Sequence, residues 1–365
     1  MRKVWLLIIT IFSVGTTDGQ ILTRIADSLR IRDGIPELSY AVIGPTSILE
    51  LHTSGHHRID DPNTKTQADI RDYFHLGSNT KAVTSFIAAM LVEQNRIKWD
   101  TRFFELYPAM QAKANPAYKD ITLQQLLSHQ AGIPAFTDGK EFAVLPSYDG
   151  EKNIQRQEFA QAVLKGRPLG PVGTSYHYSN AGYTLAALML EKVAGKSWEA
   201  IVTDVIGDGL GMQYRFGWPN SHNDTTQPYG HWLEGTRIQV LMPESPYKIS
   251  LIEPGTDLSM PITDYSKFIQ LHLNGLLGED NELKASTYKF LHFGLKDYAM
   301  GWNNGIIGDK EVSFHMGSAG TFYTYAMIDS TARRAYVIMM NCSHPLAKEA
   351  ASIFMSIMMK TKMAD

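Results

Sequence analysis

Cysteine is nearly missing from this sequence, since Cys342 is the only one among 365 residues. A single thiol excludes an intrachain disulfide framework and a cysteine-rich metal cluster. An excess of one charge is missing too, because 34 basic and 37 acidic residues leave a net charge of −3. Nucleic-acid binding requires an excess of basic residues, which this chain lacks, so we do not expect nucleic acid as a partner.

Two families of motifs are also lacking. The chain has neither a P-loop nor a G-x-G-x-x-G sequence, so no nucleotide cofactor is implied. It has no G-x-S-x-G elbow, because Met316 rather than glycine stands two residues before Ser318, and this argues against an α/β-hydrolase. Apolar material is ample: hydrophobic residues make up 44% and charged residues 19%, which excludes a largely disordered chain.

The first residues have the composition of an export signal. Two basic residues precede a mostly apolar run over 4–12, and small and polar residues follow. This order predicts a signal peptide over 1–19, cleaved after Gly19 or, as the alternative, after Gly15. The run is shorter than the roughly 20 residues that span a bilayer. We expect an exported protein, periplasmic or secreted, with no integral membrane segment after cleavage; a retained membrane anchor is the alternative.

Strand patterns gather at both ends of the mature chain. Short apolar runs over 38–44 and 47–51 flank Pro45-Thr46 and predict a hairpin. A further short strand is expected over 73–76. Near the other end, three runs predict neighbouring antiparallel strands and a fourth predicts a closing helix; they span 312–315, 322–328, 335–340 and about 346–359.

Helix patterns and Pro/Gly-marked loops fill the middle of the chain. Strands at both ends with helices between them predict one sheet that is built from both termini and holds an inserted lobe. We expect 20–85 and 250–365 to form an α/β sheet domain and 86–249 a mainly helical lobe, with the active site at their junction.

A buried helix with one charge is the first candidate for chemistry. Between Gly77 and Val92 only Lys81 is charged, and an unpaired buried ammonium costs several kcal/mol. Ser78 lies one turn before it, at the helix N-terminus, where the dipole favours a developing alkoxide. A desolvated lysine has a lowered pKa and can activate a serine nucleophile. The alternative is a helix cap at Ser78 and a Lys81 side chain that reaches solvent.

The S-x-x-K spacing alone is weak evidence. It occurs three times, at Ser78/Lys81, Ser245/Lys248 and Ser286/Lys289. Only Ser78 has a predicted strand before it and a buried helix after it.

Two more sequences carry polar groups suited to an acyl-transfer site. In Tyr178-Ser179-Asn180 a phenol beside an ammonium can lose its proton more easily and shuttle it, and the Asn180 amide can hold a substrate amide. The alternatives are a packing tyrosine and a helix cap at Asn180. His315-Met316-Gly317-Ser318 lies on a strand expected to continue through Gly320, where glycine permits close backbone approach. The alternative is an ordinary strand histidine with a bulge at Gly317.

The ordered set S-x-x-K, Y-x-N and H-x-G resembles the serine β-lactamase and penicillin-binding protein superfamily. The similarity is to the class C β-lactamase branch, which also includes D,D-peptidases, D-aminopeptidases and esterases. Segments 74–81, 121–134 and 299–302 resemble the family's nucleophile segment, its "LLSHTSGLP" segment and its late "GLGW" strand. The resemblance implies an α+β, β-lactamase-like fold: an antiparallel sheet flanked by N- and C-terminal helices, with an inserted mainly helical lobe.

The resemblance also implies roles for the motif residues. Ser78 is the acylated nucleophile, and Lys81 and Tyr178 share its activation. Asn180 holds the substrate amide, and the N–H groups of Ser78 and Ser318 bind the oxyanion, with Gly317 allowing the approach. No metal or cofactor is implied.

His315 stands where the β-lactamases have lysine, and this is the main departure from the family pattern. A histidine titrates near pH 6.5 in peptides, so we expect its charge to change at pH 6–7 and to affect substrates that bear a carboxylate. Within the resembled family, H-x-G members are often peptidases or esterases, which makes efficient β-lactam hydrolysis a weaker expectation.

Three further histidines, His52, His56 and His57, cluster around the end of the second predicted strand. No acidic or cysteine ligand stands near them at zinc-motif spacing, so a polar strand end is favoured over a metal site.

The sequence thus predicts an exported serine hydrolase that cleaves an amide or ester through a Ser78 acyl-enzyme. The substrate is a small molecule or peptide: a D-amino-acid peptide, an ester or a β-lactam. The alternative is a penicillin-binding-type receptor or binding protein that captures a ligand or is acylated without efficient turnover. The oligomeric state stays open.

Overall fold

The structure is a computed structural model, and it describes residues 18–60, 67–137, 139–221, 224–245 and 249–361. The predicted signal peptide lies almost wholly outside the described residues, as does Lys248 of the second S-x-x-K sequence. Within the described ranges no helix is both long and apolar enough to cross a bilayer.

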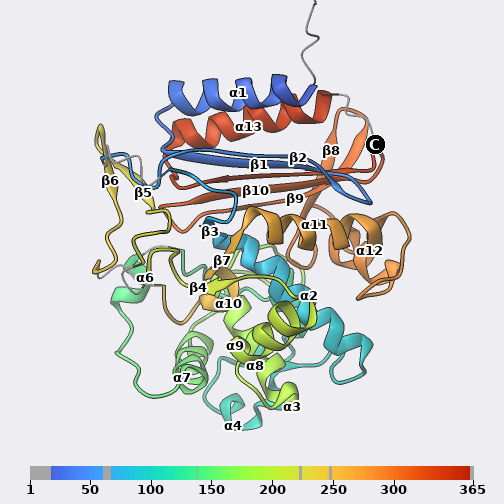
Figure 1. Ribbon diagram of the computed structural model, residues 1–365. Coiled ribbons are helices and arrows are strands. Elements are labelled where there is room, and N and C mark those ends of the chain that lie inside the picture. Colours follow the sequence, from blue (N-terminus) through green and yellow to red (C-terminus); the bar gives the residue numbers. More distant parts are fainter. Residues whose placement is uncertain (1–17, 61–66, 138, 222–223, 246–248, 362–365) are drawn as a thin grey trace, which may run out of the picture.

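A six-stranded antiparallel sheet joins the two ends of the chain (Figure 1). Strand β1 pairs with β11 in a register that places Tyr40 opposite Ile338, which confirms the prediction of one sheet built from both termini. The strands, in their order across the sheet, are β2 (Ile48–Gly55), β1 (Glu37–Ile43), β11 (Arg334–Met340), β10 (Tyr323–Asp329), β9 (Lys310–Gly317) and β8 (Asn303–Ile307).

Strand β1 is buried along its whole length because both faces of the sheet are covered. Successive side chains of a strand point to opposite faces, so Tyr40 and Val42 join one apolar cluster while Ala41 and Ile43 join the other. This explains why the strand reads as a continuous apolar run rather than as an alternating one.

The N- and C-terminal helices cover one face, at the top of Figure 1. They are α1 (Asp18–Arg32) and α13 (Pro345–Lys360). Phe354 of α13 packs edge-on against Tyr40 of β1, with ring centroids 4.9 Å apart. The predicted closing helix and the flanking arrangement are confirmed.

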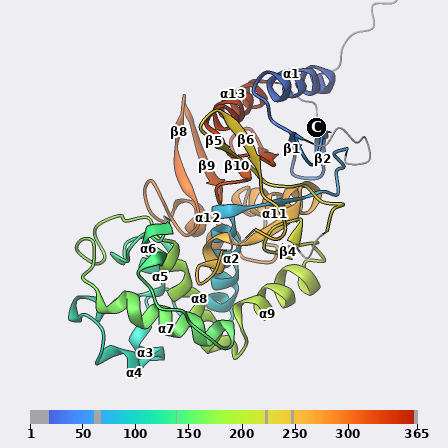
Figure 2. The same ribbon diagram turned by 90° about the vertical axis from the view of Figure 1, so that its left-hand side faces the viewer.

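Helix α11 (Ile262–Leu276) lies against the opposite face, and α2 (Thr80–Glu93) and α12 (Ala285–Phe293) follow beneath it. Residues 80–89 of α2 are all buried, which confirms the predicted buried helix. Phe86 contacts Phe268 of α11 at 5.5 Å between ring centroids. Figure 2 shows α2 between the sheet and the helices of the lobe.

The lobe consists of short helices around α8. Its helices are α3 (Phe103–Leu106), α4 (Pro108–Gln111), α5 (Leu123–Leu127), α6 (Gly139–Ala143), α7 (Lys152–Lys165), α8 (Asn180–Ala194) and α9 (Trp198–Val202), and a π-helical turn follows over Thr203–Gly209. Helix α10 (Glu253–Thr256) leads back toward the sheet.

Two smaller sheets lie outside the main one. One has the order β3 (Tyr73–His75), β7 (Leu258–Pro261), β4 (Arg215–Phe216); the other pairs β5 (His231–Glu234) with β6 (Arg237–Val240). The expected strand before Ser78 is therefore present, but it pairs with β7 rather than with the main sheet. The expected boundary between 85 and 86 falls inside α2, and the division into two domains stays a prediction.

Candidate active site

A tight turn places Ser78 at the junction of sheet and lobe. Strand β3 runs into a 3-10 turn over Gly77–Asn79, and α2 begins at Thr80. The His75 imidazole accepts a hydrogen bond from the Gly77 N–H at 3.2 Å. Its other nitrogen lies 3.1 Å from Asp257 Oδ1 and donates to it. The His75–Asp257 pair thus stabilises the turn that carries Ser78.

Two glycines let the turn press against the end of β9. Gly77 has a φ of +51°, and a Cβ on it would stand 2.4 Å from the Ser318 nitrogen. A Cβ on Gly317 would stand 2.0 Å from the Leu76 carbonyl oxygen. No side chain fits at either position, which confirms the expected close backbone approach. Strand β9 ends at Gly317, however, and does not continue through Gly320 as predicted.

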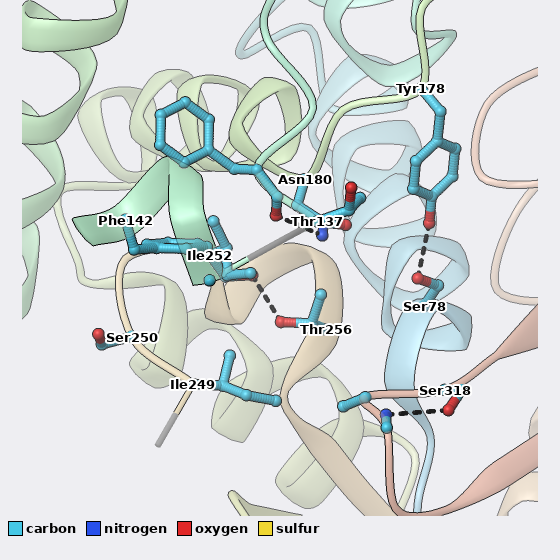
Figure 3. A pocket seen from close by; sticks show the side chains of 14 residues that line it. Ser78, Thr137, Phe142, Tyr178, Asn180, Ile249, Ser250, Ile252, Thr256 and Ser318 are labelled. Atoms are coloured by element: carbon cyan, nitrogen blue, oxygen red, sulfur yellow. Dashed lines mark hydrogen bonds between the residues drawn. The ribbon is translucent and has the colours of Figure 1, made fainter. Parts of the chain in front are cut away.

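Ser78 directs its hydroxyl at two other candidates. Its Oγ accepts a hydrogen bond from the Tyr178 hydroxyl at 2.6 Å and lies 3.2 Å from Lys81 Nζ. Figure 3 shows the Tyr178 phenol above Ser78. The N-cap position of α2 is Asn79, and it makes no side-chain cap bond, so the alternative of a capping role for Ser78 is wrong.

Lys81 is completely buried, so the alternative that it reaches solvent is wrong. Its Nζ donates to Asn180 Oδ1 at 2.6 Å and to the Gly255 carbonyl oxygen at 2.8 Å. Across the described part of the chain no carboxylate forms an ion pair with it. Burial lowers the pKa of Lys81 well below its usual value, because the charged form loses its hydration.

The partners of Lys81 fix the orientation of its amine. An uncharged amine has two hydrogens and one lone pair. A carbonyl oxygen and an amide oxygen can only accept hydrogen bonds, so Asn180 Oδ1 and the Gly255 carbonyl take both hydrogens. In the uncharged amine the lone pair would then be left for Ser78 Oγ, whereas the ammonium form donates to this oxygen as well.

Tyr178 is a neutral phenol in this arrangement. Burial raises its pKa well above the usual value, and the hydrogen bond to Ser78 lowers it only in part. The expectation that the neighbouring lysine eases its deprotonation is therefore wrong, because the desolvation of a phenolate dominates at this position.

Asn180 is the first residue of α8, and both ends of its amide are bonded within the protein. Its Nδ2 donates to the Phe136 carbonyl at 2.9 Å, while its Oδ1 accepts from Lys81. The helix cap is Ser179, whose hydroxyl accepts from the Gly182 N–H at 2.9 Å, so the alternative of a cap at Asn180 is wrong. Asn180 positions the Lys81 amine, and its contact with a substrate amide stays a prediction.

His315 is buried, and both nitrogens of its ring are bonded within the protein. Its Nδ1 donates to the Met316 carbonyl at 2.9 Å, and its Nε2 lies 3.3 Å from the Tyr298 hydroxyl, from which it accepts. Burial first, and then Lys81, lower the pKa of His315 to about 3. The expected change of charge at pH 6–7 is therefore wrong, because the imidazole stays neutral throughout that range.

His129 is a site residue that belongs to none of the three catalytic motifs. Its Nδ1 accepts from the Ser179 N–H at 3.1 Å, and its ring lies 4.4 Å from that of Tyr178 and 4.6 Å from that of Tyr298. Burial lowers the pKa of His129 well below its usual value, so it is a neutral platform for the two phenols. It belongs to the segment 121–134, whose resemblance to the family was the available signal. The Gly255 carbonyl, which accepts from Lys81, could not be predicted from sequence, because a backbone carbonyl belongs to every residue type.

The site opens into a cavity of about 540 Å³ beside Ser78 (Figure 3). No charged side chain is found among its described lining residues. They are Ser78, Phe136, Thr137, Gly139, Phe142, Tyr178, Asn180, Ile249, Ser250, Ile252, Thr256, Ser318, Ala319 and Gly320. Ser78, Tyr178, Asn180 and Ser318 line this cavity, while Lys81 lies buried next to Ser78.

Comparison with known proteins agrees with this geometry. Residues 22–353 match the family described as Beta-lactamase. The chain belongs to the beta-lactamase family, a family of serine hydrolases.

Individual relatives are distant. The chain is 23% identical over 290 residues to Protein flp of Staphylococcus aureus strain MW2, covering 77% of this chain and 55% of that protein. The chain thus spans about half the length of this curated relative.

Solved structures share the fold at low sequence identity. The octameric penicillin-binding protein homologue from Pyrococcus abyssi has a TM-score of 0.76 at 19% identity and covers 94% of this chain and 78% of its own. The D-amino acid amidase from Ochrobactrum anthropi SV3 has a TM-score of 0.71 at 18% identity, with 93% and 98% covered. These similarities confirm the predicted β-lactamase-like fold.

Proposed function

We propose that this protein hydrolyses a neutral amide or ester through an acyl-enzyme on Ser78, with the uncharged Lys81 as the base. One observation carries the proposal: the buried Lys81 amine lies between two acceptors and 3.2 Å from Ser78 Oγ. A serine hydroxyl is a weak nucleophile until a neighbouring base takes its proton. An amine whose two hydrogens are already engaged offers that base.

The proton path follows from the hydrogen bonds. As Ser78 Oγ attacks the substrate carbonyl carbon, its proton passes to Lys81. The negative charge that develops on the carbonyl oxygen is stabilised by the N–H groups of Ser78 and Ser318. The first N–H groups of a helical turn have no intrahelical acceptor, so that of Ser78 is available for this oxyanion.

Tyr178 serves the leaving group. Its hydroxyl lies 2.6 Å from Ser78 Oγ, within reach of a leaving nitrogen or oxygen on the carbonyl carbon that Ser78 attacks. The phenol passes its proton to that atom and regains one from protonated Lys81. Water then attacks the acyl-enzyme, again with Lys81 as the base, and releases the acid and free Ser78.

The described cavity favours an uncharged substrate with an apolar group. Phe136, Phe142, Ile249 and Ile252 form apolar walls, and such surfaces are recognised by burial rather than by charge. His315 is neutral and engaged with Tyr298, so it supplies no fixed cation for a carboxylate. This supports an ester or a neutral amide, such as an amidated D-amino acid derivative, over a β-lactam.

The test exposes the purified protein in parallel to a 4-nitrophenyl ester, an N-acetylated D-amino-acid amide and a fluorescent penicillin. Product release and the intact mass are followed together. We expect turnover of the ester or the amide, with a transient mass increase by the acyl group on Ser78. Turnover of the penicillin alone would contradict the substrate class. A stable adduct without turnover would favour the receptor or binding protein instead.

We also propose that the protein is exported to the periplasm or secreted. The support is the order of basic, apolar and small residues in 1–19. Expression with the full N-terminus, followed by cell fractionation and N-terminal sequencing, tests this: mature protein that begins at Gln20 or Thr16 is expected, and uncleaved protein in the cytoplasm would contradict it.

A further inference from the structure

A second group of ionisable side chains lies away from the Ser78 cavity. Glu37 begins β1, His57 follows the end of β2, and Asp72 stands just before β3. One ligand atom from each of the three lies within 4.8 Å of the others. All three residues are buried, with exposed fractions of 0%, 4% and 3% respectively.

The Glu37 carboxylate is the unusual member of this cluster. Among the described residues neither of its oxygens has a hydrogen-bond partner, and His57 Nδ1 has none either. His57 Nε2 lies 2.9 Å from Asp72 Oδ2 and is the ion-pair partner found for that carboxylate, while none is found for Glu37 in the described ranges. Buried carboxylates are normally paired with a cation or bound to a metal. The two buried carboxylates of Glu37 and Asp72 thus share one imidazole, that of His57, as a possible cation.

We propose that Glu37, His57 and Asp72 bind a divalent transition-metal ion, with zinc as the expected occupant. One imidazole nitrogen and two carboxylate oxygens are the donors that zinc takes. Mg²⁺ and Ca²⁺ need six or more oxygen ligands and several waters, which this buried site does not offer. A charge of +2 would also balance the two carboxylates.

The distances suit an ion after small side-chain movements. Zinc–oxygen and zinc–nitrogen bonds of about 2.1 Å place tetrahedral ligand atoms about 3.4 Å apart. His57 and Asp72 are 2.9 Å apart here, and one ligand atom of each of the three residues lies within 4.8 Å of the others. Three protein ligands leave the fourth position to water.

The backbone around the cluster is braced independently of any ion. The Asn341 side chain accepts from the Glu37 N–H at 2.8 Å and donates to the His57 carbonyl at 3.1 Å. Asp72 Oδ2 accepts from the Asp69 N–H at 2.5 Å. The ligand positions are thus prearranged by the fold.

The ion would have a structural role. It joins the main sheet, through Glu37 and His57, to the segment that continues from Asp72 through β3 to Ser78. None of its three ligands lines the Ser78 cavity, so the ion stabilises the scaffold and does not touch the substrate.

The sequence could not show this site. The sequence around His52, His56 and His57 favours a polar strand end over a metal site, because no acidic or cysteine ligand stands there at zinc-motif spacing. The two carboxylates come from positions 37 and 72, on either side of the histidine, and only the pairing of β1 with β2 and the path into β3 brings them together.

Zinc binding to untagged, chelator-treated protein tests the proposal. Equilibrium dialysis with metal analysis should give one zinc per chain, and Mg²⁺ should not compete. Saturating zinc should raise Tm by about 3–6 °C. Glu37→Gln and His57→Gln should weaken zinc binding at least about tenfold. His56→Gln is the matched control, since His56 is the adjacent, exposed histidine, and it should bind zinc as the wild type does.

Wild-type protein alone keeps the test decisive if a variant does not fold. Added Co²⁺ should give a visible absorption band that one equivalent of zinc removes. No stoichiometric zinc or cobalt binding by the wild type would overturn the proposal, as would unchanged binding by folded Glu37→Gln and His57→Gln. Loss of binding in His56→Gln would overturn it in favour of a surface site. In the absence of an ion, burial and the neighbouring Asp72 raise the pKa of Glu37, and a shared proton would then take the place of the metal.

Discussion

Two serine–lysine pairs of identical spacing lie near the start of helices in this chain and have opposite surroundings. Ser78 and Lys81 stand at the start of α2, where Lys81 is completely buried. Ser286 and Lys289 stand at the start of α12, and both are exposed. Residues three apart share a helix face in both cases, so local geometry does not distinguish the pairs.

The difference lies in what surrounds each lysine. Around Lys81, Asn180 and the Gly255 carbonyl take the hydrogens of the amine, and burial lowers its pKa. An exposed lysine keeps its hydration and its charge, and a charged ammonium has no lone pair with which to activate a serine. The comparison teaches that tertiary packing, and not the S-x-x-K spacing, makes the base.

The largest effect is expected from replacing Ser78, with the same replacement at Ser286 as the comparison. Ser78→Ala should lower kcat/KM for the ester by about 10⁴ or more, because the nucleophile is lost. Ser286→Ala should leave it unchanged. Ser250→Ala should lower kcat/KM far less than Ser78→Ala, because Ser250 lines the same cavity but no step of the proposed reaction passes through its hydroxyl. Steady-state rates of the three variants, with circular dichroism to verify folding, make the test, and substantial activity in Ser78→Ala would refute the assignment.

The two lysines should differ nearly as much. Lys81→Met should lower kcat by about 10³, the range of a general base, while Lys289→Met should have no effect. In Lys81→Met, Asn180 Oδ1 and the Gly255 carbonyl lose their hydrogen-bond donor, which destabilises the fold. Removal of the desolvated amine offsets part of that loss. The free energy of unfolding should therefore stay within about 2 kcal/mol of the wild type. Urea unfolding distinguishes a catalytic from a structural role of Lys81. If the variant is inactive because it has lost much more stability than this, Lys81 is structural.

Tyr178→Phe should have a smaller effect, a loss of about 10² in kcat. The ring packs on His129 with or without its hydroxyl, so the fold should be kept. The loss should shrink for esters with better leaving groups, because these need less protonation. Rates for a series of phenyl esters of rising leaving-group acidity measure this, and an equal loss across the series would remove Tyr178 from the proton path.

The smallest effect concerns His315 and the pH profile. Activity needs the uncharged amine, so kcat/KM should fall as pH falls through the lowered pKa of Lys81. His315, with a pKa of about 3, should add no step at pH 6–7, where a titrating histidine could change the rate about tenfold. His315→Gln should therefore keep the shape of the profile. A step near pH 6.5 that this variant removes would show that His315 faces the substrate after all.

Much of the site could be predicted from sequence because its side chains come in short motifs. Ser78, Lys81, Tyr178 and Asn180 were identified with their order, and the strands of the main sheet followed from their apolar runs. A buried helix with a single lysine was itself the signal for the base.

The remainder depends on tertiary contacts that leave no local pattern. The Gly255 carbonyl holds Lys81, yet any residue type has a carbonyl. The rotation of His315 toward Tyr298 is set by packing against a neighbouring segment, so the histidine was expected to titrate. Strand β3 was recognised as a strand, but its pairing with β7 depends on residues far along the chain.

The protonation state of Lys81 is the central claim, and nuclear magnetic resonance of its side chain tests it most directly. In protein labelled with ¹³C at the lysine Cε, the signal that disappears in Lys81→Met is that of Lys81. Its chemical shift is followed as pH is raised from the acid limit of the folded state. The account predicts that this signal titrates well below the usual lysine pKa, so that the amine is uncharged where the enzyme is active. A signal that stays in the ammonium form up to the usual lysine pKa would contradict the account.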